Sequence, residues 1–131
     1  MILTIKVKLI NWSGTIELDD SSTFEDLHYV IQQSVEFDND HLYEFYLATS
    51  DRSRNRSVIS SYEDSDTITL KSFFPIPSGK KLFYLFDYGD NWVFQVSLPR
   101  KAPFSAVSGV NYPQLINETG EKPVQYPDWE E

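Results

Sequence analysis

Cysteine is absent from this chain of 131 residues, and glycine occurs only five times. Without thiols there is no disulfide, thiolate metal site or cysteine nucleophile, which excludes a disulfide-stapled secreted scaffold and favours a cytoplasmic protein. No segment matches a glycine-rich phosphate loop, a serine nucleophile elbow, a zincin helix or a dinucleotide fingerprint. The sequence therefore excludes the enzyme classes that these motifs mark.

Long apolar runs are also absent. Lysines interrupt the apolar N-terminal segment 1–12 and no small-residue cleavage site follows, so it does not read as a signal peptide. No stretch approaches the roughly 20 apolar residues that a membrane span needs. We therefore expect a soluble protein without a membrane partner. Its length predicts one domain over 1–131, with a core in 1–98 and a Pro- and aromatic-rich extended tail, 99–131, packed on it.

Positive charge is scarce, since 11 Lys and Arg oppose 20 Asp and Glu and leave a net charge of -9. A field of this sign repels phosphate backbones, so direct DNA binding is disfavoured and an unidentified protein partner is expected. Aromatic residues make up 15% of the chain. Their burial favours an ordered domain over a disordered one.

Apolar and polar residues alternate from Leu3 to Leu9, as in a strand with one buried face. Ser13-Gly14 predicts a turn, and the run 15–18 then completes a β-hairpin. A helix is predicted over 23–36, because Ser22 and Glu25 have the spacing of a capping box and apolar residues recur at helical spacing after them.

The aromatic run 41–47 predicts a third strand, and the polar composition of 49–66 predicts a long surface loop. Segment 67–74 is compatible with one helical turn or a short strand. The runs 82–87 and 92–98 flank a turn at Tyr88–Asn91 and predict a second hairpin. The expected register pairs Asp87 with Trp92, Leu85 with Phe94 and Phe83 with Val96. These elements predict an α+β fold, a mainly antiparallel sheet of about five strands with one main amphipathic helix packed on one face, β-grasp-like by analogy.

Three segments, LHYVIQQSVEF, DNDHLYEF and FYLFDYGDNW, resemble the plasmid pRi ORF-three-like family. The matching residues are Leu27, His28, His41, Leu42, Phe45, Asp87, Gly89, Asp90 and Trp92. The resemblance implies the company of plasmids and mobile elements, and some members carry resolvase-like labels, but it brings no established reaction. The chain departs from the family at Phe94, where His is usual, at Ser13, where Arg follows the early Trp, and across the tail 121–129.

Two histidines and three acidic residues are the candidates for chemistry. Asp87 and Asp90 could hold a hard cation through their oxygens, although Asp is also common in turns, where it bonds nearby amides. His28, on the apolar helix face, and His41 could form a two-His metal site with Glu44 or Asp87, or could be structural. Trp92 stands beside Asp87 at the edge of the expected core. The structural role is favoured at each place, so no cofactor is expected beyond a possible divalent metal.

Two segments are candidates for partner binding. Arg52, Arg54 and Arg56 surround serines, as in a serine recombinase, but a loop without a rigid scaffold cannot preorganise a phosphate. A solvated loop or a contact with an anionic partner is favoured. In the tail, Tyr112, Tyr126 and Trp129 either anchor a partner or hold the tail on its own sheet.

Three functions remain open. The first is a non-catalytic binding or accessory domain of plasmid or mobile-element type, which uses the sheet, the arginine loop or the tail. The second is a metal-dependent hydrolase or phosphoryl-transfer enzyme built on the His, Asp and Glu residues. The third is an acidic nucleic-acid mimic or an accessory of a DNA system, suggested by the net charge.

Overall fold

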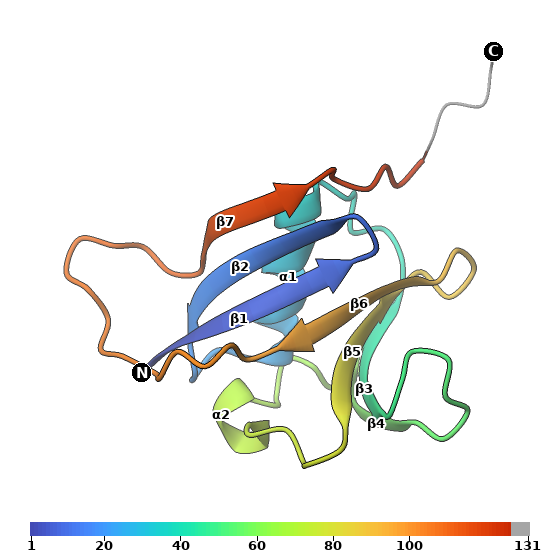
Figure 1. Ribbon diagram of the computed structural model, residues 1–131, viewed down its shortest axis with the longest axis horizontal. Helices are drawn as coiled ribbons and strands as arrows, with labels where there is room; N and C mark the ends of the chain where they lie inside the picture. Colours follow the sequence, from blue (N-terminus) through green and yellow to red (C-terminus); the bar gives the residue numbers. More distant parts are fainter. Residues whose placement is uncertain (127–131) are drawn as a thin grey trace.

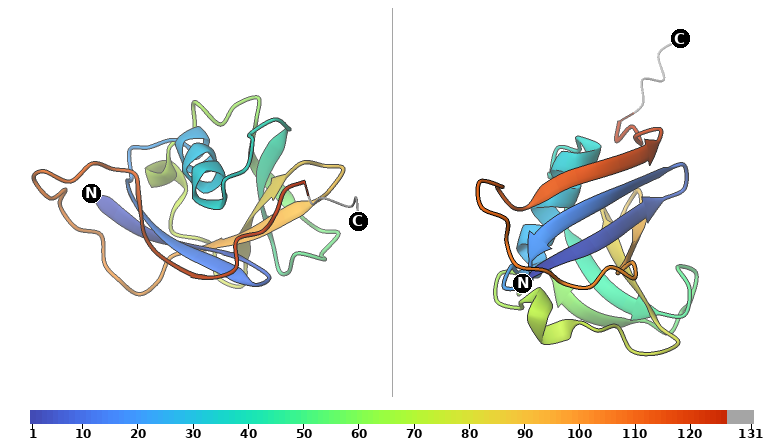
Figure 2. Two further views of the ribbon diagram at one scale, coloured as in Figure 1. Left: turned by 90° about the horizontal axis from the view of Figure 1, so that it is seen from above. Right: turned by 60° about the vertical axis from the view of Figure 1, so that its left-hand side comes forward.

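The computed structural model describes residues 1–126 and shows a seven-stranded sheet in the order β4-β3-β5-β6-β1-β2-β7. All neighbouring strands are antiparallel, and helix α1 lies across one face of the sheet (Figures 1 and 2). The elements are β1 (Ile2–Leu9), β2 (Trp12–Asp19), α1 (Phe24–Val35), β3 (Tyr43–Ala48), β4 (Ser57–Ser61), α2 (Leu70–Phe73), β5 (Lys81–Phe86), β6 (Trp92–Ser97) and β7 (Gln114–Gly120). Within 1–126, no helix has the length and the apolar character to cross a membrane.

The expectation of about five strands and one helix is wrong, because the sheet has two further strands and α2 is a second, one-turn helix. Strand β4 lies in the expected loop 49–66, and β7 lies in the expected extended tail. Both are edge strands that pair on one side only. Most of their side chains stay in contact with water, so neither strand shows the apolar alternation that marks a half-buried strand.

The first hairpin forms as predicted, but its turn lies at Ile10-Asn11 instead of Ser13-Gly14. Gly14 sits inside β2, where it makes room for a neighbouring indole. A Cβ atom at this position would lie 2.7 Å from the Trp12 ring. The glycine therefore marks a close approach within a strand, which glycine in a strand often does.

Helix α1 begins one residue later than predicted. Thr23, not Ser22, is the N-cap, and its hydroxyl accepts a hydrogen bond from the backbone N–H of Asp26 at 3.1 Å. The Asp26 carboxylate accepts in return from the backbone N–H of Thr23 at 2.9 Å. This reciprocal pair is a capping box built on Asp in place of the usual Glu or Gln.

The second hairpin also forms, but its register differs by one residue from the prediction. The observed pairs are Phe86 with Trp92, Tyr84 with Phe94 and Leu82 with Val96. Asp87 leaves the strand with a left-handed φ of 66°, which lengthens the loop to residues 87–91. A slip of one residue exchanges the two faces of a strand, so Tyr84 and Phe86 point into the core and Phe83 and Leu85 point away from it.

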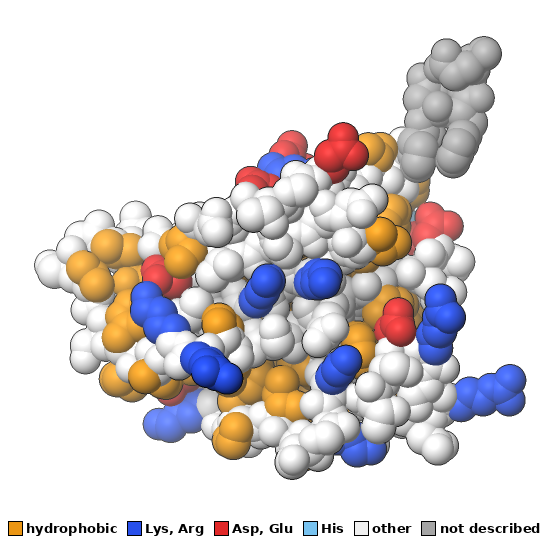
Figure 3. Space-filling model, in the orientation of Figure 1, with side chains coloured by type: hydrophobic (Ala, Val, Ile, Leu, Met, Phe, Trp, Pro, Cys, Tyr) orange, Lys and Arg blue, Asp and Glu red, His pale blue; other side chains and the backbone are white. Residues whose placement is uncertain are grey.

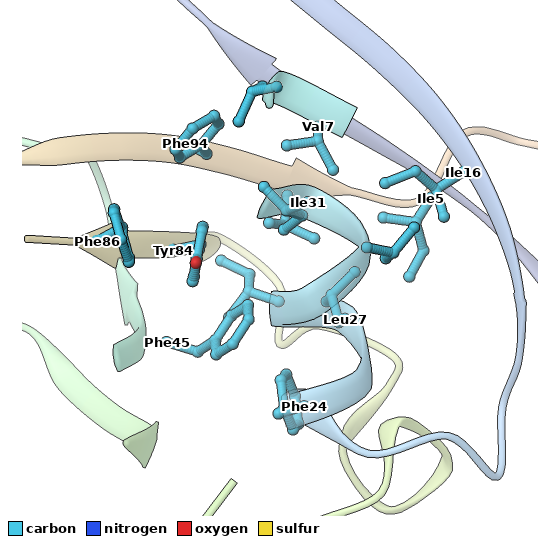
Figure 4. Close-up of a cluster of buried hydrophobic side chains, with 14 of the residues drawn as sticks. Ile5, Val7, Ile16, Phe24, Leu27, Ile31, Phe45, Tyr84, Phe86 and Phe94 are labelled. Atoms are coloured by element: carbon cyan, nitrogen blue, oxygen red, sulfur yellow. The ribbon is translucent and has the colours of Figure 1, made fainter. Parts of the chain in front are cut away.

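The main core lies between α1 and the sheet (Figure 4). Leu27 and Ile31 of the helix pack among apolar side chains from the central strands. The opposite side of the sheet, which we call the open face, has no helix over it (Figure 2). Alternation along β1, β2, β5 and β6 gives its members as Thr4, Lys6, Lys8, Ser13, Thr15, Glu17, Lys81, Phe83, Leu85, Val93, Gln95 and Ser97.

Gly120, at the end of β7 beside the first hairpin, should not tolerate substitution. Gly79 and Gly120 both have left-handed φ values, 80° and 82°, but only at Gly120 would a Cβ meet backbone, at 1.8 Å from the Asn11 carbonyl oxygen. We expect Gly79→Ala to lower the free energy of unfolding by about 1 kcal/mol from backbone strain alone. Gly120→Ala should lower it by at least about 2 kcal/mol more, because the backbone must move. Urea unfolding of both variants measures the difference, and equal losses would contradict the packing described.

Candidate functional site

Three segments that lie far apart in the sequence meet at one end of the sheet. They are the connection from α1 to β3 (residues 36–42), the β5–β6 loop (87–91) and the C-terminal segment 121–126 (Figure 1). Most residues that carry the family resemblance lie in or beside these segments. The convergence follows from the antiparallel pairing of β3 with β5, which places the start of β3 beside the end of β5.

His41 stands at the centre of this junction, with its side chain 37% exposed. Its Nε2 atom lies 3.3 Å from Oδ2 of Asp87 and 2.8 Å from the hydroxyl of Tyr126. The Tyr126 hydroxyl donates to Oδ2 of Asp40 at 2.7 Å, so it accepts from the N–H of His41. This bond to Asp40 raises the pKa of Tyr126 to about 12 and lowers the pKa of Asp40.

Asp87 shapes the β5–β6 loop as well as facing His41. Its Oδ1 accepts hydrogen bonds from the backbone N–H groups of Gly89 at 3.1 Å and Asp90 at 3.3 Å. Its own backbone N–H donates to the Leu42 carbonyl at 2.9 Å, which ties the loop to the segment that carries His41. The carboxylate thus combines the local bonding of a turn Asp with one contact across the junction.

The C-terminal segment is held at the junction by Gln125, whose residue is 7% exposed. Its Oε1 accepts from the backbone N–H of Asp38 at 2.7 Å, and its Nε2 donates to Oδ1 of Asp40 at 2.9 Å. Nearby, Lys122 pairs with Glu36. We call residues 121–126, fastened in this way, the C-terminal latch.

His28 belongs to a separate, buried network beneath the junction. The residue is 1% exposed, and its ring stacks on Tyr43 with centroids 3.5 Å apart. Gln32 donates to the Tyr84 hydroxyl at 3.0 Å, which leaves that hydroxyl to donate to Nδ1 of His28. The Nε2–H then donates to Oδ1 of Asn39 at 2.6 Å. Burial lowers the pKa of His28 to about 4, against a smaller opposing effect of Asn39, and the ring stays neutral at pH 7.

The expected site residues are brought together only in part. His41 and Asp87 are in contact, and the rings of both histidines lie beside Phe86. Asp90 contributes its backbone N–H to Asp87, and Trp92 packs edge-on against Phe37.

Glu44 lies on the other side of the sheet. It pairs with Leu85 of the open face, whereas its neighbours Tyr43 and Phe45 are in the main core. Both ring nitrogens of His28 are already bonded within the protein. Among residues 1–126, no three His, Asp or Glu side chains are arranged to hold a metal ion.

The candidate partner-binding residues lie elsewhere. Arg52 and Arg54 are exposed on the loop before β4, and the guanidinium of Arg56 lies 4.2 Å above the ring of Tyr46. Tyr112 accepts a hydrogen bond from the backbone N–H of Val107 within its own loop. Tyr126 belongs to the C-terminal latch, and Trp129 lies outside the described residues.

Sequence reasoning missed Asn39, Asp40, Tyr84 and Gln125. Asn39 and Asp40 have the composition of a loop and give no further signal, but Asn39 has a left-handed φ of 53° and bonds His28, and Asp40 bonds Gln125. Tyr84 was assigned to the wrong face by the register error. Gln125 gives no signal, because a polar residue between prolines predicts an exposed tail.

The low pKa of His28 predicts an acid-sensitive fold. In the unfolded chain His28 binds a proton near pH 6.5, and in the folded chain only near pH 4. The contribution of His28 to the free energy of unfolding is therefore fully present above pH 6.5 and is lost as the pH falls toward 4. Between about pH 7.5 and about pH 4.5 this residue alone should lower the free energy of unfolding by roughly 2.5 kcal/mol. Urea titrations of the wild type and of His28→Gln isolate the effect, since the carboxylates titrate in both. Parallel pH profiles would contradict the buried neutral ring.

The C-terminal latch predicts a contrast between neighbouring residues. Gln125→Ala leaves the Asp38 N–H and the Asp40 carboxylate without their partner and should lower the free energy of unfolding by about 1–2 kcal/mol. Val124, which is 61% exposed, provides the control, and Val124→Ala should change stability by less than about 0.5 kcal/mol. Amide hydrogen exchange at Asp38 should accelerate only in Gln125→Ala, and unchanged protection there would refute the latch.

Comparisons with known proteins identify a family, a relative and a solved structure that this chain resembles. The family model described as plasmid pRiA4b ORF-3-like protein matches residues 2–125. The uncharacterised protein y4hQ of Sinorhizobium fredii is 29% identical over 74% of this chain and 49% of its own length, so the chain spans about half of that relative. A crystal structure of a protein of unknown function from Methanosarcina mazei Go1 shares the fold, with a TM-score of 0.71 and 24% identity over 89% of this chain and 68% of that one. The match over nearly the whole chain confirms the resemblance seen in the sequence, and the chain belongs to the plasmid pRiA4b ORF-3-like family.

Proposed function

We propose that the chain is a non-catalytic binding module, an accessory protein of plasmid or mobile-element type, that contacts a protein partner through the open face of its sheet. One observation carries the proposal. The open face gathers lysines in a protein whose net charge is -9. Glu17 of β2 and Glu44 of β3 also lie on this face, and Glu17 is 8% exposed and pairs with Lys101.

Lys6 and Lys8 form the centre of this positive surface. Both side chains are exposed on β1 and point away from α1. Their strand neighbours on β2 and β6 are uncharged polar residues, namely Thr15, Ser13, Ser97 and Gln95. Figure 3, which looks onto the open face, shows Lys and Arg side chains spread over it with few acidic ones between them.

Neither lysine is neutralised from within the described part of the chain. The ion pairs found in residues 1–126 use Lys101 and Lys122 but neither Lys6 nor Lys8. Unpaired charges of one sign on a broad face steer and orient a partner of the opposite charge. The open face is thus suited to recognition, and the groups it offers are fixed by the sheet beneath them.

The polar junction at the end of the sheet supports a structural role in place of a catalytic one. Both nitrogens of His28 are bonded internally, and Asp87 has one oxygen on two backbone amides and the other toward His41. Such groups hold the loops and the C-terminal latch in position. This supports a module in which the junction supplies stability and the open face supplies binding.

Two features favour a protein over a nucleic acid as the partner. The net charge of -9 repels a long polyanion. Proteins that bind single-stranded nucleic acids also offer exposed aromatic rings on which the bases stack. The aromatic residues of β3 and β5 on the open face, Tyr46 and Phe83, are 0% and 4% exposed and offer no such surface.

The test is a matched pair of charge reversals. Lys6→Glu changes the open face, and Lys71→Glu makes the same change of charge on α2. Each tagged protein is used to purify partners from its native cell, and bound proteins are identified by mass spectrometry. We expect a partner retained by the wild type and by Lys71→Glu to be reduced at least about tenfold by Lys6→Glu. Recovery of every bound protein equally by both variants, at equal melting temperature, would exclude the open face as the binding surface.

A further inference from the structure

A hollow of about 300 Å³ opens on the face that we propose for binding. Phe83 of β5 and Val93 of β6, which are diagonal neighbours across the two strands, belong to its lining and are apolar. Lys8 and Lys81 line it from β1 and β5. The hollow therefore combines an apolar surface with positive charge on two sides.

Ile10 adds an unusual apolar group to the lining. It stands at the β1–β2 turn, is 85% exposed and has a φ of 25°. A positive φ is strained for a β-branched residue, and full exposure gains it no burial within the chain. Glycine or asparagine would form this turn without that strain. A strained and exposed isoleucine beside a hollow indicates a residue that serves binding more than folding.

The spacing of the charges suits an extended peptide. Lys8 pairs with Gln95 and Gln95 pairs with Phe83, so these three residues form one row across the sheet, and Lys81 lies two residues along β5. With strands about 4.8 Å apart and about 3.3 Å per residue, the Cα atoms of the two lysines lie roughly 12 Å apart. In an extended segment, residues on one side at positions i−2 and i+2 are separated by roughly 13 Å.

We propose that the hollow receives an extended acidic segment of the partner protein. One aliphatic or aromatic side chain of the segment enters the hollow against Ile10, which is 85% exposed, and Val93, which is half-buried. Phe83 lies beneath them and is 4% exposed. Acidic residues on either side of it, on the same side of the segment, pair with Lys8 and Lys81. The inference rests on the function proposed above and adds the chemistry of the partner.

The lining also explains why the charges alone do not define the ligand. Asp51 is the one carboxylate among the lining residues of the described chain, and it weakens the attraction of the two lysines for any anion, a small inorganic anion included. A ligand that also buries an apolar group gains free energy that such an anion cannot. The match is therefore to an acidic and apolar protein segment instead of a free phosphate or a nucleic acid.

The direct test uses a short fluorescein-labelled peptide with a central leucine and glutamates two positions away on each side. Fluorescence anisotropy with the purified full chain should show binding that Lys8→Glu weakens about tenfold and that Lys71→Glu changes less than about twofold. Replacing the leucine of the peptide by serine should also weaken binding about tenfold. Absence of binding to the wild type, or equal binding of the serine peptide, would overturn the proposal.

Ile10→Gly separates binding from folding. Glycine accepts the positive φ, so the melting temperature should stay equal or rise while peptide binding weakens several-fold. Unchanged affinity would overturn the role of Ile10 in the hollow. If a single-stranded oligonucleotide displaces the peptide and binds more tightly, the ligand of the hollow is a nucleic acid and not an acidic protein segment. If sedimentation shows self-association that Lys8→Glu abolishes, the ligand is a second copy of this chain.

The two proposals fail in different ways. Loss of the native partner with Lys6→Glu, together with no binding of the peptide, leaves the open face as the binding surface and rejects only the acidic segment. Retention of every native partner with Lys6→Glu rejects the proposed function itself, and peptide binding would then describe a site without a partner. The melting temperature of each variant controls for loss of fold.

Discussion

The architecture depends on the packing of one short helix against one broad sheet. Helix α1 has 12 residues and is therefore about 18 Å long, whereas seven strands span roughly 29 Å. The helix buries the central strands through Leu27 and Ile31, and no second long helix covers the opposite side of the described chain. The other side of the sheet has no helix over it and carries exposed polar and charged residues beside a small apolar cluster on β3, β5 and β6. The open face is a direct result of this imbalance.

The same imbalance explains the polar junction at one end of the sheet. The connection after α1 must return to β3 over a distance in which the helix no longer shields the core. Asn39, His28 and Gln32 close that gap with side-chain hydrogen bonds, and Gln125 closes it from the other side. Buried polar groups are tolerated there because each of these bonds has a defined partner. The family residues His41 and Asp87 thus use their polar groups mainly in contacts within the protein.

The parts of the fold that sequence reasoning predicted are those with a strong local signal. The helix, the first hairpin and the pairing of 82–87 with 92–98 all rest on apolar periodicity, and each is present. The edge strands β4 and β7 were not predicted, because most of their side chains contact solvent and their sequences therefore lack the alternation of apolar and polar residues. The one-residue register error arose at Asp87, whose left-handed backbone ends β5 early, and side-chain alternation alone could not reveal this. Of the candidate site, the contact of His41 with Asp87 follows from strand pairing, whereas the capture of Gln125 depends on tertiary packing that no local pattern encodes.

The position of β7 has a consequence for how the chain assembles. Strand β2 is made early, yet its outer edge pairs with residues synthesised about a hundred positions later, as in the bond from the Trp12 indole N–H to Glu118, 106 residues away. Contacts of such long range close large loops and slow folding. Until β7 emerges from the ribosome, β2 presents an unpaired edge that other chains can join. Strand β7 therefore covers an edge that could otherwise pair with other chains, and nascent chains of this fold should depend on chaperones until β7 is made.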